Sequence, residues 1–544
     1  MYVVDLLLEE SKGQRASILV VATTAGIANA LLLVGANVLA KSPKDADLRA
    51  FCIFGLTMTL YALGSRSTYH RTTSLVEGVL YRVRTRIAEK IERTELEGLE
   101  RIGTAEIFDR VTENMSIVSE QGWMLGSFLQ SLFVLVFGLI YIAWLSLPAF
   151  ALVALMLVFG FFIVQYRFAE VAEALRQMGQ LRLTLFDMVM DLLKGFKEAK
   201  FSRRRGREIH NDIVVTAESL RAGAMKTAEV ISGIVVMPNC VLYILLGAVV
   251  FTMPRYVDVD VQTMVSLVAC TAFVWGPFTS VAGGLNALFR SSVAFEQIRV
   301  LEGKLDEAVR RAAVQKTEDP WDGRVGAIST RDIVYEYPSD NGDRTFRVGP
   351  LSLDIAPGEV VFLVGGNGSG KSTLLKVLTG LYPRSDGELR VGGVLVQPEN
   401  VAAYREMISA IYTDFHLFSK LYGALDAEPG AVRALIAQMG LEGKTSFDKH
   451  RFTRRNLSTG QRKRLATIVT LLEDRPIYVF DEWAADQDPE FRRYFYEELV
   501  PALKRRGKTV IAVTHDDRYF HCADRVIKLN YGKIQATTQM DAAP

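Results

Sequence analysis

The distribution of apolar residues constrains this chain most, because these residues gather in the first 290 of its 544 positions. Several stretches there are long enough to cross a lipid bilayer, which takes about 20 helical residues. The second and fourth are short, so their helices should continue into water. We expect six membrane spans: 17–40, 48–64, 122–146, 148–164, 230–253 and 261–281.

The connections between these spans are of two kinds. Segments 41–47, 147 and 254–260 are short, whereas 65–121 and 165–229 are long and carry nine and twelve Lys or Arg residues. Basic connections favour the cytoplasmic side of a membrane. We therefore expect the long connections and both termini in the cytoplasm.

The two long connections have the periodicity of helices. Residues 76–110 and 167–229 contain few glycines and no proline. We expect spans two to five to continue as helices beyond the bilayer and to turn near 96–103 and 194–207. These turns should contact the soluble C-terminal half, which must be joined mechanically to the membrane.

A charged helical connector over 291–324 precedes a segment of different character. From residue 325 short β-rich runs alternate with helical ones, which predicts a parallel sheet with helices on its faces. The runs that define this alternation are 328–337, 360–364, 374–380, 408–412, 476–480 and 509–513.

The strand at 360–364 leads into the pattern G-x-x-x-x-G-K-[ST] and then a helical run from Leu374. Such a loop wraps phosphates with backbone amides, and the following helix adds its dipole. Lys371 would hold the β- and γ-phosphates of ATP, and the Ser372 hydroxyl would ligate Mg²⁺. The predicted ATP-binding loop comprises Gly365, Gly366, Asn367, Gly368, Ser369, Gly370, Lys371, Ser372 and Thr373.

A second acidic element follows the apolar run 477–480. Asp481 fits a carboxylate that supports Mg²⁺, and Glu482 fits the base that polarises an attacking water. Two acids after a strand are common, but after a phosphate loop in the same sheet they predict nucleotide hydrolysis.

A third element, LSTGQ at 457–461, lies between the other two. It resembles the LSGGQ signature of ATP-binding-cassette (ABC) proteins, with threonine in place of one glycine. In that family the serine and a glycine amide contact the γ-phosphate bound on the other subunit, roles that Ser458 and Gly460 match. A helix starting there would add its dipole. The signature residues are Leu457, Ser458, Thr459, Gly460 and Gln461.

The same resemblance assigns three further positions. Asp488 matches the D-loop aspartate, and His515 after the strand 510–513 matches the switch histidine. Tyr337 matches the aromatic residue that stacks on adenine, with Tyr335 as the weaker choice.

This chain departs from the common family pattern at several places. The expected glutamine after 408–412 is absent, and either Thr413 or Asp414 stands at its position. The segment before the signature, 449–455, is basic. Together with TDFHLF (413–418), LSTGQRKRL (457–465) and FDEWAADQDP (480–489), these changes resemble exporters of cyclic peptides and siderophore precursors. Pyoverdine, syringomycin and microcin-type pumps belong to that bacterial group.

The resemblance covers the whole chain and implies the layout of a half-size ABC exporter. It implies an all-α six-span transmembrane domain over 1–300, a linker over 301–324 and an α/β P-loop nucleotide-binding domain over 325–544. Such a multidomain membrane protein would lie in the bacterial cytoplasmic membrane. Because the chain has one phosphate loop and one signature, a homodimer is expected.

The resemblance further implies ATP-driven export of a peptide-like natural product by alternating access. A lipid flippase or multidrug exporter, and an ATP-gated regulator that does not transport, remain alternatives. The net charge of +2 gives no support to a nucleic-acid partner. Polar residues in the spans, such as Asn37, Gln130 and Tyr141, fit bonds between helices better than cargo contacts. No cargo residue is predicted.

Overall fold

The computed structural model describes residues 15–41, 47–257, 259–311, 319–322, 326–337 and 346–540. Two compact units make up the chain. One comprises Met1–Ala88 and Ala105–Glu302, and the other Glu89–Thr104 and Gly303–Pro544. The predicted linker 301–324 lies partly outside the described residues. The sequence did not predict that residues 89–104 group with the C-terminal unit.

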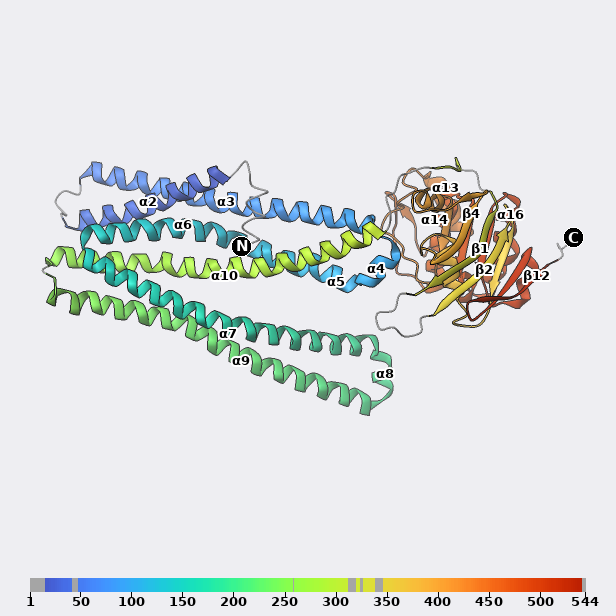
Figure 1. Ribbon diagram of the computed structural model, residues 1–544. Helices are drawn as coiled ribbons and strands as arrows, with labels where there is room; N and C mark the ends of the chain where they lie inside the picture. Colours follow the sequence, from blue (N-terminus) through green and yellow to red (C-terminus); the bar gives the residue numbers. More distant parts are fainter. Residues whose placement is uncertain are drawn as a thin grey trace. The chain divides into compact units, whose positions relative to one another are not determined.

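The first unit is helical, as the sequence predicted (Figure 1). Its described helices include 3-10 and π-helical segments, labelled η. They are α2 (Arg15–Lys41), α3 (Leu48–Glu92, which crosses into the second unit), α5 (Thr104–Asp109), η2 (Arg110–Asn114), α6 (Met115–Leu145), α7 (Leu147–Lys194), α8 (Phe196–Phe201), α9 (Arg203–Gly247), η3 (Ala248–Thr252), η4 (Met253–Arg255) and α10 (Val261–Arg311).

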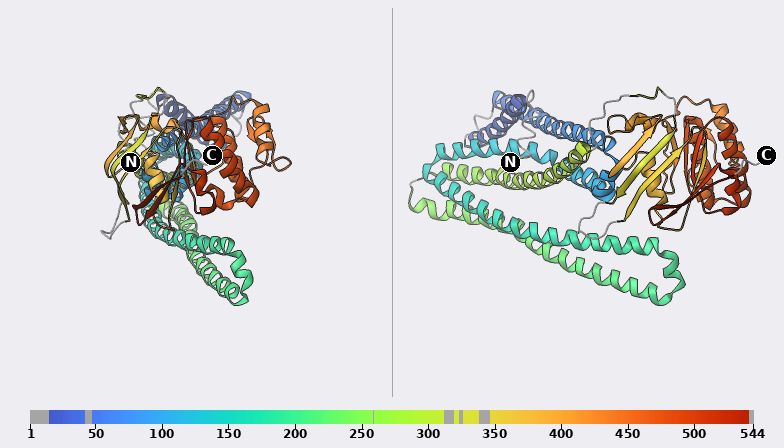
Figure 2. Two further views of the ribbon diagram at one scale, coloured as in Figure 1. Left: turned by 90° about the vertical axis from the view of Figure 1, so that its right-hand side faces the viewer. Right: turned by 45° about the vertical axis from the view of Figure 1, so that its right-hand side comes forward.

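The helices that contain the second and fourth predicted spans, and most of the fifth, continue well past the predicted ends of those spans. Helices α3, α7 and α9 are 45, 48 and 45 residues long, about twice what a bilayer needs. Figure 2 shows α7 and α9 side by side as a hairpin closed by α8. The predicted turn near 194–207 is therefore α8, and Ser202 caps the next helix by accepting a hydrogen bond from the Arg205 amide at 3.2 Å.

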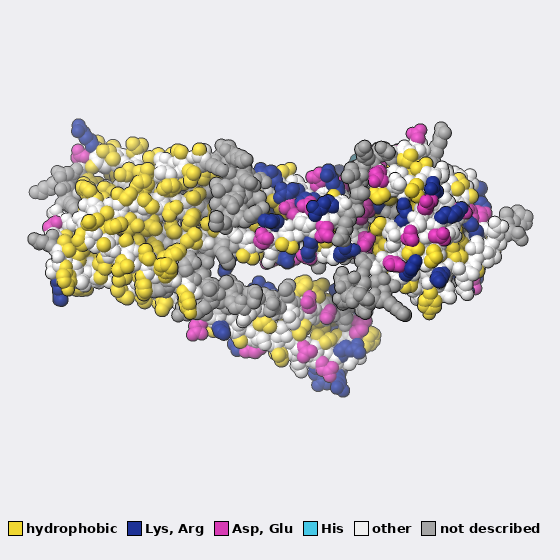
Figure 3. All heavy atoms as spheres, viewed as in Figure 1, with side chains coloured by type: hydrophobic (Ala, Val, Ile, Leu, Met, Phe, Trp, Pro, Cys, Tyr) yellow, Lys and Arg dark blue, Asp and Glu magenta, His cyan; other side chains and the backbone are white. Residues whose placement is uncertain are grey.

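Apolar side chains cover the outside of this helical unit. Figure 3 shows them as a broad band over one end of the helices, with charged side chains over the other end. In α3 only 6% of the most apolar 18-residue window is buried. Such a surface is costly in water and favourable in lipid, which supports membrane insertion.

Length and composition identify four described helices as able to span a membrane. They lie within α2, α3, the run from Glu106 to Leu145, and α10. The fourth and fifth predicted spans correspond to shorter apolar helices, Leu147–Phe162 and Asn239–Arg255.

Polar groups inside the helical unit pair between helices, as the sequence predicted. The Asn37 amide donates to the Tyr141 hydroxyl at 3.4 Å. The Gln130 amide donates to the Ser65 hydroxyl at 2.8 Å. These bonds satisfy groups that would be costly in an apolar environment.

The second unit contains a six-stranded sheet, a four-stranded sheet and a small hairpin. Their orders are β12-β11-β3-β10-β9-β6, β2-β1-β4-β5 and β7-β8. The strands are β1 (Ile328–Glu336), β2 (Arg347–Ile355), β3 (Val360–Val364), β4 (Asp386–Val391), β5 (Val394–Leu395), β6 (Ile408–Ile411), β7 (Phe447–Asp448), β8 (Arg451–Phe452), β9 (Ile477–Asp481), β10 (Thr509–Val513), β11 (Arg525–Asn530) and β12 (Lys533–Gln539).

Helices pack around these sheets and connect their strands. They are α4 (Leu96–Ile102), α11 (Lys371–Leu378), α12 (Val401–Glu406), α13 (Pro429–Gln438), α14 (Thr459–Glu473), η5 (Trp483–Asp486), α15 (Pro489–Arg493), η6 (Tyr494–Leu499), α16 (Val500–Arg505) and η7 (Asp517–Cys522).

The six-stranded sheet confirms the predicted parallel core. Strands β6, β9, β10, β3 and β11 pair in parallel, and β12 adds an antiparallel edge. Strands β3, β9 and β10 are buried along their whole length, as expected for a sheet covered on both faces. Of the six predicted runs, 374–380 lies mostly in helix α11 and the other five fall on strands.

Alternate side chains of β3 enter two separate cores. Phe362 packs in a cluster with Tyr478 and Phe495, whereas Leu363 packs in another with Leu375. The two cores fix the sheet from both sides and hold the carboxyl ends of β3, β10 and β9 next to one another. Ligands bind at this edge in open α/β sheets.

Candidate nucleotide site

The predicted phosphate loop lies directly between β3 and α11. Gly370, the residue before α11, has a φ of +96°, which favours glycine. A Cβ atom on Gly365 would lie 2.3 Å from the Leu529 carbonyl oxygen, so a side chain would not fit there either. The sequence therefore places glycines where the backbone must curl tightly, and the loop can present its amides to phosphates.

Lys371 lies inside this loop and is 5% exposed. Its ammonium group donates to the carbonyl oxygens of Gly365 and Gly366, both at 3.0 Å. Burial lowers the pKa of Lys371, and the carboxylates of Glu482 and Asp481 oppose that shift. The ammonium group is thus held where a bound phosphate would meet it.

Asp481 ends β9 and lies beside the start of α11. Its carboxylate accepts hydrogen bonds from the Ser372 hydroxyl at 3.3 Å and the Thr413 hydroxyl at 3.2 Å. Burial raises the pKa of Asp481, while these two bonds oppose the shift. Of the two candidates for the missing glutamine, Thr413 has this contact. Asp414 is exposed in the loop beside it.

These oxygen atoms suit a magnesium ion. A buried carboxylate and two hydroxyl groups are hard ligands, and Mg²⁺ often takes only one or two carboxylates together with phosphate oxygens and water. Among the described residues, no group of three or more His, Cys, Asp or Glu could hold a metal by itself. Asp481, Ser372 and Thr413 could therefore hold Mg²⁺ only together with a nucleotide.

Glu482 follows Asp481 and turns away from the strand with a φ of +49°, an unusual value for a residue with a side chain. Its Oε1 atom lies 3.1 Å from His515 Nε2. His515 follows β10, the strand next to β9, so the parallel sheet brings together two residues 33 positions apart. The pair is partly exposed and accessible to water.

Tyr337 lies at the end of β1, and its hydroxyl is 2.9 Å from that of Thr373. The ring meets Tyr335 edge to face at 5.1 Å between centroids. Tyr335 is 3% exposed and belongs to the core, whereas Tyr337 is only partly buried. The geometry thus favours Tyr337 as the residue that can stack on a base.

The signature residues begin helix α14. Ser458 forms a capping box with Gln461, in which each side chain accepts a hydrogen bond from the backbone amide of the other residue at 3.4 Å. Ser458 and Thr459 are exposed. In the part of the chain that the structure describes, no hydrogen bond joins them to the phosphate loop.

Asp488 caps the next helix, α15, by accepting a hydrogen bond from the Phe491 amide at 2.9 Å. The structure therefore brings together the phosphate loop, Asp481, Glu482 and His515. It leaves the signature and the D-loop aspartate outside that cluster.

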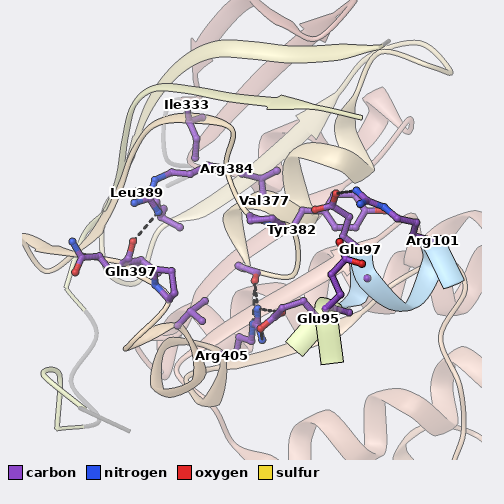
Figure 4. Close-up of a pocket in the computed structure, with 18 of the residues that line it drawn as sticks. Glu95, Glu97, Arg101, Ile333, Val377, Tyr382, Arg384, Leu389, Gln397 and Arg405 are labelled. Carbon is purple, nitrogen blue, oxygen red and sulfur yellow. Dashed lines mark hydrogen bonds and ion pairs between the residues drawn. The ribbon is translucent and has the colours of Figure 1, made fainter. Parts of the chain in front are cut away.

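The sequence did not identify the residues that fasten α4 to the rest of its unit (Figure 4). Arg405 binds both carboxylate oxygens of Glu95, at 3.1 and 2.5 Å. The Tyr382 hydroxyl donates to Glu100 at 2.6 Å and accepts from Lys376 at 3.1 Å. The predicted contact between the turn at 96–103 and the C-terminal half is confirmed.

A cavity of about 640 Å³ lies beside these contacts. Its charged lining residues include Glu97, Arg101 and Arg384. The lining contains both acidic and basic side chains, so it shows no preference for one sign of charge.

Comparison with known proteins agrees with this site. A family model described as ABC transporter matches residues 348–485. The ATP-binding protein SyrD of Pseudomonas syringae pv. syringae is 32% identical over 470 residues, which cover 84% of this chain and 82% of SyrD.

Two further relatives match smaller parts. An ATP-dependent lipid A-core flippase of Thiobacillus denitrificans is 28% identical over 312 residues, 54% of this chain and 52% of the flippase. A macrolide export ATP-binding/permease protein, MacB of Sodalis glossinidius, is 32% identical over 221 residues, 37% of this chain and 33% of MacB.

Proposed function

Because the chain belongs to the ABC transporter family, we propose that two copies of it form a homodimer that exports a peptide-like natural product. The ABC transporter domain indicates an ATPase coupled to membrane translocation, and the relative MacB, named a macrolide export protein, supports the direction of export. The observation that supports hydrolysis most directly is the 3.1 Å contact between Glu482 and His515 beside the phosphate loop.

The site residues divide the work of hydrolysis among them. Lys371 and the loop amides bind the phosphates, and Tyr337 stacks on the adenine. Asp481, Ser372 and Thr413 would hold Mg²⁺, which when bound would supply positive charge to the phosphate oxygens. Glu482 takes a proton from the attacking water, and His515 orients the Glu482 carboxylate through the bond between them.

The separation of the signature from the phosphate loop supports a dimer. The start of α14 is exposed, and its amides and dipole suit an anion. A second copy facing it would place its own ATP there, and the reverse contact would form by symmetry. Ser458 and Gly460 would then bind the partner's γ-phosphate, with Asp488 at the same interface.

Closure of such a pair would drive alternating access in the membrane unit. Moving a two-state equilibrium from 1:99 to 99:1 takes about 5.5 kcal/mol of differential binding. Two ATP molecules held between cassettes could supply this, and hydrolysis would reset the inward-facing state. Both termini and the long helical extensions would then lie on the cytoplasmic side of a bacterial inner membrane.

The cargo class rests on the motifs at 413–418, 457–465 and 480–489, which resemble those of cyclic-peptide and siderophore-precursor exporters. The similarity to the lipid A-core flippase supports lipid as a second candidate. Stimulation of ATPase activity by a cyclic peptide or a siderophore precursor, and not by lipid or small amphiphiles, would separate the two.

The experiment compares the ATPase rate of the full chain in lipid vesicles with that of Glu482→Gln. We expect the variant to lose activity about a hundredfold while it still binds ATP, because only the base is removed. Wild-type protein with no activity above the variant would instead support a regulator that does not transport.

A further inference from the structure

Lys463 is a buried charge that the proposed function does not use. It lies on α14 one turn after Gly460, and its side chain is 1% exposed. A lysine is almost never fully buried unless it is paired. Its ammonium group lies 2.6 Å from the Glu482 carbonyl oxygen and 2.7 Å from a carboxylate oxygen of Asp486.

The Glu482 carbonyl is a sensitive place for such a bond. Glu482 has a φ of +49°, a conformation that persists only when its surroundings hold it. The Lys463 ammonium group fixes the peptide that follows Glu482, and Asp486 balances the charge. The direction of the Glu482 side chain is therefore set partly from α14.

Three more contacts fasten the same segment to α14. The Trp483 indole donates to the Thr467 hydroxyl at 2.8 Å, and the Gln487 amide donates to the Gly460 carbonyl oxygen at 3.1 Å. A Cβ atom on Gly460 would lie 2.4 Å from the Asp486 carbonyl oxygen. The start of α14 and residues 482–487 thus behave as one body.

We propose that Lys463 is a positioning residue for hydrolysis, which holds Glu482 in its productive conformation and ties it to the signature helix through Asp486. The proposal rests on the role of Glu482 as the base in the proposed function. Among the described residues no hydrogen bond or ion pair joins Lys463 to the phosphate loop or to Asp481, so its effect on hydrolysis would pass through Glu482.

The test is the Mg²⁺-dependent ATPase activity of the full chain in lipid, with Lys463→Met. Methionine keeps the apolar stem and removes the donor. We expect kcat to fall about tenfold to a hundredfold, as for a misplaced catalytic group, with the KM for ATP within about twofold. Thr470→Val removes a buried hydroxyl from the same helix without touching residues 482–487, and it should leave both constants unchanged.

The decisive comparison repeats Lys463→Met in the Glu482→Gln background. If Lys463 acts through Glu482, the second substitution should change the residual rate less than twofold, because residues acting as a unit are not additive. An equal loss in both backgrounds would overturn the proposal. If Glu482→Gln alone left kcat unchanged, the proposed function would fail and not merely this inference.

A milder variant covers the case in which Lys463→Met does not fold. Asp486→Asn keeps Lys463 and removes its charge partner at a half-exposed position. We expect kcat to fall severalfold at unchanged KM, and a wild-type kcat would contradict the proposal.

Discussion

We propose that Thr413, rather than Asp414, takes the place of the family's glutamine, because its hydroxyl lies 3.2 Å from the carboxylate of Asp481. Thr413→Val removes that hydroxyl at nearly constant volume. We expect the Mg²⁺ concentration for half-maximal ATPase activity to rise severalfold, because one hard ligand is lost. A magnesium titration at saturating ATP measures this shift.

Two variants serve as controls for Thr413. Thr413→Ser keeps the hydroxyl and should titrate as wild type. Asp414→Asn should also titrate as wild type, because Asp414 lies exposed and outside the contact with Asp481. If Asp414→Asn raised the magnesium requirement and Thr413→Val did not, the assignment would be reversed.

A separate prediction concerns Tyr337 and the adenine base of ATP. Stacking of a base on an aromatic ring is worth about 1–3 kcal/mol. Tyr337→Leu should therefore raise the KM for ATP about tenfold with little change in kcat. Tyr337→Phe, which loses only the 2.9 Å hydroxyl contact with Thr373, should stay close to wild type. Equal effects of Tyr337→Leu and Tyr337→Phe on the KM for ATP would contradict the prediction that Tyr337 stacks on adenine.

At the scale of single residues, the sequence predicts those whose role follows from a short local motif. Lys371, Asp481 and Glu482 could be assigned because loop, strand and acid follow one another directly. Lys463 and Arg405 could not be assigned from the sequence, because each binds a residue from a segment distant in the chain. The sequence carries no signal for Lys463, which lies in a polar run between Arg462 and Arg464.

Helix α4 is the element that joins the long extension of α3 to the C-terminal unit. Its anchor is the two-pronged contact between Arg405 and Glu95, whose side chains are 27% and 21% exposed. Gly98 packs so closely that a Cβ atom would lie 2.9 Å from the Ala308 Cβ. The packing of α4 thus depends on an ion pair and on a glycine at position 98, which has no side chain to clash with Ala308.

We expect Arg405→Ala to keep the basal ATPase rate within about twofold, because no hydrogen bond or ion pair joins Arg405 to the described residues of the hydrolysis site. We expect the variant to lose stimulation of the ATPase by cargo, because Arg405 anchors α4 through Glu95. Arg390→Ala breaks the 2.8 Å ion pair with Glu388 on β4 and should keep stimulation. Full stimulation of Arg405→Ala would show that this contact does not transmit the cargo signal.

Elements with strong periodicity were predicted well. The long helices carry apolar residues with a period of 3.6, and the buried strands β3, β9 and β10 are continuous apolar runs. Strands β2 and β4 were not predicted, because β2 contains Gly349 and Pro350 and β4 contains Gly387. Glycine and proline usually mark turns, so they weaken the sequence signal of a strand.

At the scale of the whole molecule, one chain contains both an apolar helical unit and a nucleotide site. In the proposed dimer, each site takes its phosphate loop from one chain and its signature from the other. Cross-linking of single cysteines at Ser458 and Asn367 tests the dimer, because both side chains are exposed. We expect ATP to promote a disulfide between two chains when one carries Ser458→Cys and the other Asn367→Cys, after Cys52, Cys240, Cys270 and Cys522 are replaced. The same pair within one chain should not cross-link, and intrachain cross-linking alone would contradict the arrangement.

ATP-driven export is the central claim, and uptake into inside-out membrane vesicles tests it most directly. Vesicles containing the wild-type chain should accumulate a labelled cyclic peptide or siderophore precursor when ATP is added. Vesicles containing Glu482→Gln should not. Uptake that is the same with and without ATP, or the same in both proteins, would contradict the account.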